Sequence, residues 1–168
     1  MVEDSLSFHE IDADAESTQV ASFLATHVWP FHSKSRLSLD AARNVALGPT
    51  EDVRAFWIEQ NRNKVGLIRL LDLKDVEDGS VQFDIRLAKE SRGHGIGRAA
   101  VLWLTIKLFS DYPSLHRIEA TTRIDNQAMR RALESNGYQL EGRLRETWPT
   151  DDGIRFDTAL YGRLRSDA

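Results

Sequence analysis

The sequence predicts a mixed α/β fold of the α+β kind, and three observations support this prediction. The chain of 168 residues is 41% hydrophobic and 29% charged, a balance typical of a globule with a buried core. Hydrophobic residues recur both at helical spacing and with strand-like alternation, in the order β-α-α-β-β-β-α-β-α-β-β. Three consecutive strands are joined by short polar turns, which predicts a mostly antiparallel sheet of six or seven strands flanked by about four helices. No repeat or linker divides residues 1–168, so we expect a single domain.

The N-terminal third is expected to form one strand and two helices. Residues 6–11 alternate between apolar and polar side chains, which predicts a short strand. Residues 12–28 carry apolar side chains at helical spacing behind Asp14, a candidate N-cap. Residues 38–49 form the second expected helix, capped by Ser38 and stopped by the Gly-Pro pair at its end.

The middle of the chain is expected to form an antiparallel meander. Residues 53–60 and 64–73 are strand-like runs separated by the turn-forming sequence Asn-Arg-Asn. Residues 80–88 alternate cleanly, so the side chain of Asp84 is expected on the polar face and that of Ile85 on the apolar face.

The second half is expected to alternate helices and strands. A glycine-rich loop leads into a helix over residues 96–109, and residues 115–122 follow as a strand. The next helix has Asp125 as a candidate N-cap and Gly137 at its C-terminal stop. Two last strands, roughly 138–148 and 154–164, flank the turn Pro-Thr-Asp-Asp-Gly.

Composition excludes several classes of function. The chain has no cysteine, so disulfides, thiolate metal sites and a cysteine nucleophile are ruled out. The net charge of −4 argues against a nucleic-acid partner, and the spacing of the five histidines supports no metal site. The acidic N-terminus lacks the pattern of a signal peptide, and no apolar run approaches the length of a membrane span. We therefore expect no membrane partner and a cytoplasmic location.

The glycine-rich loop before the third expected helix indicates an anion site. Gly93, Gly95 and Gly97 lie between two arginines, at a point where backbone N–H groups are free and the helix dipole is positive. A phosphate or diphosphate is the expected ligand. A P-loop is excluded because no Gly-Lys-Ser/Thr sequence follows. Residues 95–100 satisfy the dinucleotide pattern G-x-G-x-x-A, but that pattern belongs after the first strand of a parallel unit rather than after a meander. A loop that only turns a corner is the remaining alternative.

The same loop resembles a family signature. Its Arg-x-x-Gly-x-Gly sequence is similar to the Q/R-x-x-G-x-G/A signature of the GNAT N-acetyltransferase superfamily, whose order of elements is also the one given above. Residues 123–146 resemble a stretch found in its ribosomal-protein N-terminal and polyamine acetyltransferase branch. The matching positions are Asn126, Glu134, Gly137, Tyr138, Glu141 and Gly142. The resemblance implies a GNAT-like domain that uses acetyl-CoA as co-substrate and needs no metal.

The resemblance also implies which residues bind the cofactor and which act in catalysis. Asp84 is a candidate base because it lies on the polar face of its strand, with Glu119 as a second candidate, and the resemblance implies that Asn126 helps line the far side of the cofactor channel and makes it a catalytic candidate as well. A backbone N–H around residues 83–85 would stabilise the oxyanion of the thioester. The implied cofactor contacts are Ile85, Leu87, Arg92, Gly93, His94, Gly95, Ile96, Gly97, Arg98 and Asn126.

The expected acceptor is a primary amine, either a small molecule or a protein N-terminus. The family layout places it between the loop joining the first two helices and the turn joining the last two strands. The substrate-binding candidates there are Trp29, His32, Asp151 and Asp152, because aromatic and acidic groups suit a cationic amine. Homodimer formation stays open.

Two positions depart from the family pattern and keep alternatives open. Leu133 stands where many relatives have a tyrosine that protonates the leaving thiolate, and Met129 replaces the serine of the branch. A non-catalytic acyl-CoA-binding module is therefore one alternative to an N-acetyltransferase. A nicotinamide-dependent oxidoreductase, suggested by the G-x-G-x-x-A match, is another.

Overall fold

The computed structural model describes residues 6–78 and 81–167 and confirms the predicted order of elements. The expected strands and helices are all present within these residues, together with short 3-10 turns after β3, β4 and β7. The elements are β1 (Leu6–Glu10), α1 (Ala13–Thr26), α2 (Leu39–Arg43), β2 (Arg54–Gln60), β3 (Asn63–Leu71), β4 (Gln82–Leu87), α3 (Ile96–Asp111), β5 (Arg117–Arg123), α4 (Gln127–Glu134), β6 (Gln139–Pro149) and β7 (Arg155–Leu164).

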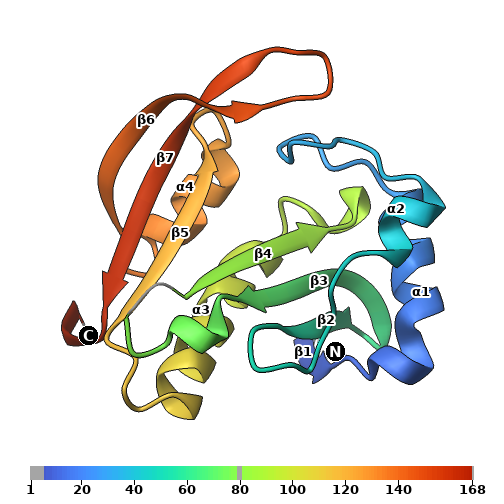
Figure 1. The fold of residues 1–168 in the computed structure, drawn as a ribbon, viewed down its shortest axis with the longest axis horizontal. Helices are drawn as coiled ribbons and strands as arrows, with labels where there is room; N and C mark the ends of the chain where they lie inside the picture. The colour runs from blue at the N-terminus through green and yellow to red at the C-terminus, as the bar shows by residue number, and fades with distance from the viewer. Residues whose placement is uncertain (1–5, 79–80, 168) are drawn as a thin grey trace.

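The strands form two antiparallel sheets that meet at one point. The first sheet has the order β1-β2-β3-β4, and the second has the order β5-β7-β6. Val81, just before β4, forms a parallel bridge with Ile118, and its carbonyl accepts a hydrogen bond of 3.0 Å from the N–H of Glu119. Beyond this bridge β4 and β5 diverge (Figure 1). The predicted antiparallel character is confirmed, and the divergence opens the sheet in its middle.

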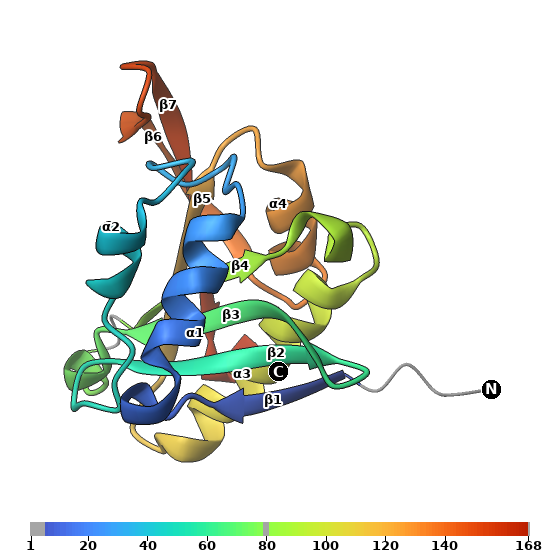
Figure 2. The same ribbon diagram turned by 90° about the vertical axis from the view of Figure 1, so that its right-hand side faces the viewer.

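The first sheet is buried on both faces, because helices cover each of them (Figures 1 and 2). On β2, Phe56 and Ile58 point into the core formed with α3, whereas Ala55 and Trp57 point to the core formed with α1. This alternation follows from the two-residue period of a strand. The two cores fix the first sheet between its helices and hold the start of β4 in place.

The N-caps of two helices differ from the predictions. The N-cap of α1 is Asp12 rather than Asp14, since Asp12 Oδ1 accepts from the N–H groups of residues 14 and 15 at 3.1 and 3.2 Å. The N-cap of α4 is Asn126 rather than Asp125, which pairs with Arg123 instead. Helix α2 keeps the predicted cap Ser38.

Helix α2 also ends earlier than predicted, at Arg43. The side-chain amide of Asn44 donates to the carbonyl of Asp40 at 2.9 Å, which takes the acceptor that a further turn of helix would use. Leu47 then packs into the core beside α1 as part of an irregular segment.

The core along α3 gives a stability prediction. Leu104 is fully buried on α3, whereas Ile106 on the same helix is 61% exposed. Leu104→Ala is expected to lower the free energy of unfolding by about 2–5 kcal/mol, because it leaves a cavity. Ile106→Ala is the matched control and should change it by less than about 0.5 kcal/mol. Urea unfolding of both variants measures the difference, and equal effects would contradict this packing.

Candidate functional site

A cavity of about 480 Å³ lies where β4 and β5 diverge. Four parts of the chain contribute to its wall: residues 29–32 before α2, residues 85–87 of β4, the loop from Arg92 to Arg98, and one face of α4. Most of the sequence-predicted cofactor residues are therefore brought together around one space. No Asp or Glu belongs to its wall among the described residues.

The glycine loop presents unused backbone donors at the N-terminus of α3. Gly93 and Gly95 both have φ of +82°, which a side chain would strain, and a Cβ at either position would meet nothing within 4 Å. The N–H groups of residues 93–98 have no acceptor within the described part of the chain. Free amides at the start of a long helix form an anion site.

The arginines around the loop differ in what they contact. Arg92 donates to the carbonyls of Leu87 at 2.9 Å and Val28 at 2.7 Å, and burial lowers its pKa. It therefore holds β4 and the segment before α2 together. Arg98 and Arg131 line the cavity, and their side chains have no partner within residues 6–78 and 81–167.

Two loop residues predicted to contact the cofactor lie off the cavity wall. The side chain of His94 is exposed, and that of Ile96 is buried in the core. Their backbone N–H groups still belong to the free set.

Arg131 lines the cavity but was not among the cofactor residues predicted from the sequence. Its helical spacing could have indicated it, because it lies three residues after Ala128 and four before Ser135, on the face of α4 that lines the cavity.

The edge of β4 offers further donors to the cavity. The N–H of Ala88 donates to the carbonyl of Val65 on the β3 side at 2.9 Å. Because N–H directions alternate along a strand, the N–H groups of Ile85 and Leu87 point away from β3 and into the gap. An extended ligand can hydrogen-bond to such an edge as an added strand does.

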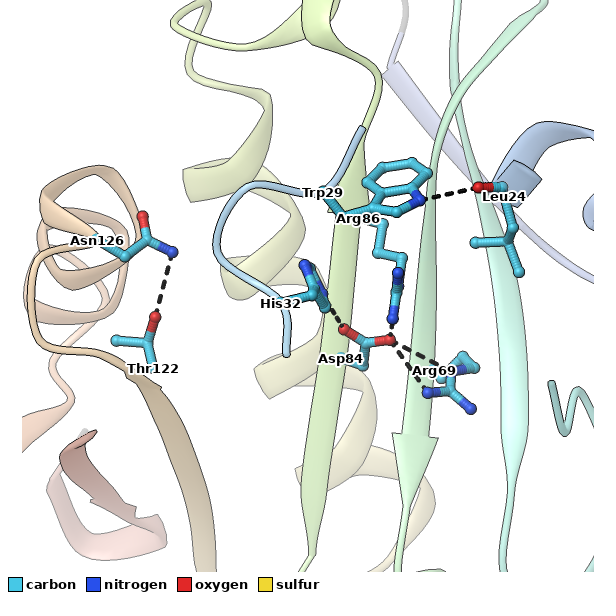
Figure 3. A network of polar contacts seen from close by, with 8 residues as sticks. All are labelled: Leu24, Trp29, His32, Arg69, Asp84, Arg86, Thr122 and Asn126. Atoms are coloured by element: carbon cyan, nitrogen blue, oxygen red, sulfur yellow. Dashed lines mark hydrogen bonds and ion pairs between the residues drawn. The ribbon is translucent and has the colours of Figure 1, made fainter. Parts of the chain in front are cut away.

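His32 and Asp84 form a pair between the loop and β4 (Figure 3). His32 Nε2 lies 2.8 Å from Asp84 Oδ1, while Asp84 Oδ2 accepts from Arg69 at 3.1 Å and from Arg86 at 3.2 Å. Burial alone would raise the pKa of Asp84, but the hydrogen bond from His32 and the charges of His32, Arg86 and Arg69 hold it well below its usual value. Asp84 therefore stays ionised and is a weak proton acceptor.

Trp29 is a core residue that also forms part of the cavity wall. It is 1% exposed, and its indole N–H donates to the carbonyl of Leu24 at 2.9 Å. The guanidinium of Arg86 lies 5.4 Å from the centre of its ring. The tryptophan thus positions the segment that carries His32.

Asn126 lies on the opposite wall from His32 (Figure 3). Its Oδ1 caps α4 by accepting from the N–H of Met129 at 3.2 Å, and its Nδ2 donates to Thr122 Oγ1 at 3.2 Å. The start of α4 is therefore fixed to the end of β5, and Met129 lines the cavity beside it.

Among the described residues no tyrosine lies on the cavity wall, and the hydroxyl of Ser135, which does lie there, donates to the carbonyl of Ala132 at 3.1 Å. Leu133 is buried in the core rather than on the cavity wall. The hydroxyl of Tyr138 pairs with Thr105 at 2.8 Å, and burial raises its pKa. Tyr138 is thus a residue of the hydrophobic core.

The predicted acidic substrate residues lie outside the cavity wall. Asp151 Oδ2 accepts from the N–H and hydroxyl of Ser35 at 2.9 and 3.3 Å, so it connects the β6–β7 hairpin to the segment before α2. Asp152 accepts from Thr150 at 2.5 Å within its own turn. Glu119 pairs with Arg117 at 3.4 Å on β5 and also lies off the wall.

Comparison with known protein families shows to which family the chain belongs. A model described as an acetyltransferase (GNAT) domain matches residues 2–139, most of the chain. The chain belongs to this family. The resemblance found in the sequence is therefore confirmed, and the protein is a GNAT acetyltransferase. No curated protein sequence matches the chain.

Solved acetyltransferases share its fold at low sequence identity. RimL, a ribosomal L7/L12 alpha-N-protein acetyltransferase in complex with coenzyme A, has 16% identity and a TM-score of 0.81, covering 100% of this chain and 98% of its own. A chimera of spermidine N-acetyltransferase SpeG from Vibrio cholerae and hSSAT has 19% identity and a TM-score of 0.76, covering 96% of each chain. AAC(6')-Ib in complex with ribostamycin and coenzyme A has 19% identity and a TM-score of 0.75, covering 98% and 96%.

The described residues contain no group of three His, Cys, Asp or Glu side chains placed to hold a metal ion. None of their helices is both long enough and apolar enough to cross a bilayer.

The ion pairs of Asp84 with Arg69 and Arg86 predict that the stability of the fold depends on pH. Asp84→Asn removes the partner of two arginines and should lower the free energy of unfolding at pH 7 by about 3–5 kcal/mol. Because the folded pKa of Asp84 lies below its usual value of 3.8, the carboxylate stabilises the fold above about pH 4, and this contribution is lost as the pH falls further. The difference between wild type and variant should narrow by about 1 kcal/mol from pH 5 to pH 3.

Urea unfolding across this range measures the effect. Asp40→Asn is the control, since the side chain of Asp40 is 89% exposed and its loss should matter little at any pH. A constant difference between wild type and Asp84→Asn over the whole range would contradict the lowered pKa.

Proposed function

We propose that this acetyltransferase takes its acetyl group from acetyl-CoA and transfers it directly to a primary amine. The observation that carries the proposal is the cavity between β4 and β5. One end of it holds the free amides of residues 93–98, and its wall carries the inward-pointing N–H groups of Ile85 and Leu87. A diphosphate suits the first feature and an extended pantetheine arm suits the second.

The charges of the wall support this placement of the cofactor. Arg98 and Arg131 are unpaired among the described residues and line the same cavity as the free amides, where they would neutralise phosphate groups. The fold neighbours RimL and AAC(6')-Ib were both determined with coenzyme A, which agrees with the same assignment. A nicotinamide cofactor is disfavoured, because the loop follows the last strand of an antiparallel meander.

Direct attack by the amine is the simplest chemistry for this cavity. The chain has no cysteine that would carry an acyl-enzyme. An N–H of β4 at Ile85 would hydrogen-bond the thioester oxygen as negative charge develops on it. Asn126 would close the opposite wall and hold the acetyl end in place. Positioning of this kind contributes about 7–11 kcal/mol to lowering a barrier.

The acceptor in this proposal is a small-molecule amine or a protein N-terminus. It would enter between the segment before α2 and the β6–β7 hairpin, which Asp151 joins through Ser35. The described neighbours acetylate a ribosomal protein N-terminus and spermidine, which supports the class of acceptor. The wall itself has no carboxylate among the described residues, so it offers a polycationic amine no ionic partner.

Thermal unfolding with ligands tests the cofactor assignment. Acetyl-CoA at about 100 times its Kd should stabilise the fold by about 2.7 kcal/mol, whereas NADPH should not stabilise it. Gly95→Ala should weaken acetyl-CoA binding by about 5- to 30-fold, because the free loop can relax away from φ of +82° and binding must then restore this conformation at a cost of about 1–2 kcal/mol. Gly153→Ala is the matched control: it carries the same strain at φ of +80° in the hairpin, and acetyl-CoA affinity should not change. Stabilisation by NADPH alone would overturn the assignment.

Release of CoA over a panel of amines and peptides tests the reaction. Turnover above the rate without enzyme is expected for at least one primary amine. Acetyl-CoA binding without any turnover across the panel would instead support an acyl-CoA-binding module, the alternative that Leu133 and Met129 raise.

A further inference from the structure

We propose that His32, and not Asp84, accepts the proton from the attacking amine, with Asp84 as its positioning residue. This inference rests on the proposed acetyl transfer and assigns the proton acceptor within the same site. It follows from the chemistry of the cavity wall, the hydrogen bond between the two side chains, and the way the loop of His32 is anchored.

Among the described residues, His32 is the one titratable wall residue whose neutral side chain has a nitrogen that can accept a proton. The other titratable groups on the wall, within the described residues, are Arg86, Arg92, Arg98 and Arg131. Arginine stays protonated in proteins and accepts no proton, whereas an imidazole exchanges protons in the physiological range. The wall includes no carboxylate there and no tyrosine.

The hydrogen bond to Asp84 sets which nitrogen of His32 is available. Nε2 lies 2.8 Å from Asp84 Oδ1, and Asp84 accepts because its carboxylate stays ionised. In the neutral imidazole the proton therefore lies on Nε2, and Nδ1 carries the lone pair. Nδ1 has no hydrogen-bond partner in the part of the chain that the structure describes.

Asp84 is suited to hold the imidazole rather than to accept the proton itself. Its second oxygen, Oδ2, is shared by Arg69 and Arg86, which leaves only Oδ1 for His32. The two arginines come from neighbouring strands and fix the plane of the carboxylate. A carboxylate fixed in this way orients an imidazole and stabilises the protonated ring that forms during reaction.

The segment that carries His32 is anchored on several sides. The N–H of His32 donates to the carbonyl of Trp29 at 3.0 Å, and Trp29 is buried in the core. Arg123 donates to the carbonyl of Pro30 at 3.3 Å, and its guanidinium lies between the rings of Phe31 and Phe156, at 4.9 and 3.9 Å from their centres. A base held this firmly loses little entropy when the reacting geometry forms.

The charged groups around His32 define its environment. Asp84 and Arg86 face it from β4, and Arg69 stands behind them on β3. Arg92 lies over Trp29 from the glycine loop, and Arg123 over Phe31 from β5. These are the groups that would influence the proton equilibrium of the ring.

The proposed step balances atoms and charge. The nitrogen of the neutral amine forms a bond to the carbonyl carbon of acetyl-CoA, and the C–S bond breaks with its electron pair leaving on sulfur. The proton lost by the nitrogen goes to His32 Nδ1. Transfer of one proton from the imidazolium to the thiolate, directly or through water, then gives neutral His32, the thiol of CoA and the amide.

A pair of acceptors that differ in proton affinity tests this role. The CoA-release assay with amines and peptides shows which class of acceptor to use. For a small-molecule acceptor the pair is an alkylamine and the alkoxyamine of the same chain, and for a peptide acceptor it is a glycyl peptide and its aminooxyacetyl analogue. The alkoxyamine nitrogen is neutral and gives up its proton more readily, so it needs less help from a base. His32→Gln keeps a donor near Asp84 but has no group to accept a proton.

For the ordinary amine, His32→Gln should lower kcat/KM by about 10²–10⁴-fold, the usual contribution of a general base. For the alkoxyamine the loss should stay below about ten-fold, because its nitrogen needs less help from a base. The control is His9→Gln, because the side chain of His9 is 60% exposed and lies off the cavity wall. It should change neither rate.

The outcomes separate this inference from the proposed function. Equal losses for both acceptors, or no loss for either, would overturn the assignment of His32 while leaving acetyl transfer intact. Wild-type protein that fails to bind acetyl-CoA or to release CoA would instead overturn the proposed function. Should His32→Gln not fold, His32→Ala is assayed with added imidazole: restored turnover supports the assignment, and its absence counts against it.

Discussion

The divergence of β4 and β5 after one bridge is the constraint on which the site depends. Val81 and Ile118 hold the two strands together at one end, and no further pairing between β4 and β5 follows within the described residues. The edge of β4 therefore keeps N–H groups that a continuous sheet would have used. Because α3 begins and α4 lies beside the open end, the free amides of the glycine loop face the same space.

The electrostatics of this space follow from where the acids are placed. Arginines supply the charges of the wall, while the carboxylate of Asp84 lies off the wall and accepts from two arginines. A wall of this kind favours an anionic ligand such as a diphosphate. It also disfavours an ammonium group, so an amine would have to react in its neutral form, and proton removal becomes a requirement on the protein.

Features encoded by neighbouring residues could be predicted from the sequence, and features made by distant ones could not. The order of elements follows from local hydrophobic periods, and the glycine loop follows from a run of adjacent residues. The pair between His32 and Asp84 joins positions 52 residues apart, so no local sequence pattern predicts it. Asp151 was expected beside a cationic substrate, yet its carboxylate is taken up by Ser35, a partner that only the tertiary fold brings near. The caps at Asp12 and Asn126 were missed by one or two residues, because neighbouring aspartates offered equally good sequence signals.

The replacement of the family tyrosine by Leu133 has a consistent explanation in this geometry. Leu133 packs into the core, so a tyrosine at that position would need α4 to present a different face. The hydroxyl of Tyr138 is held by Thr105 inside the same core, and Tyr138 does not line the cavity either. A site without a phenol must return a proton to sulfur by another route. In the proposed reaction, the imidazole of His32 accepts the proton of the amine and can then donate a proton to the thiolate. A single histidine thus acts first as base and then as acid, and a separate acid is unnecessary.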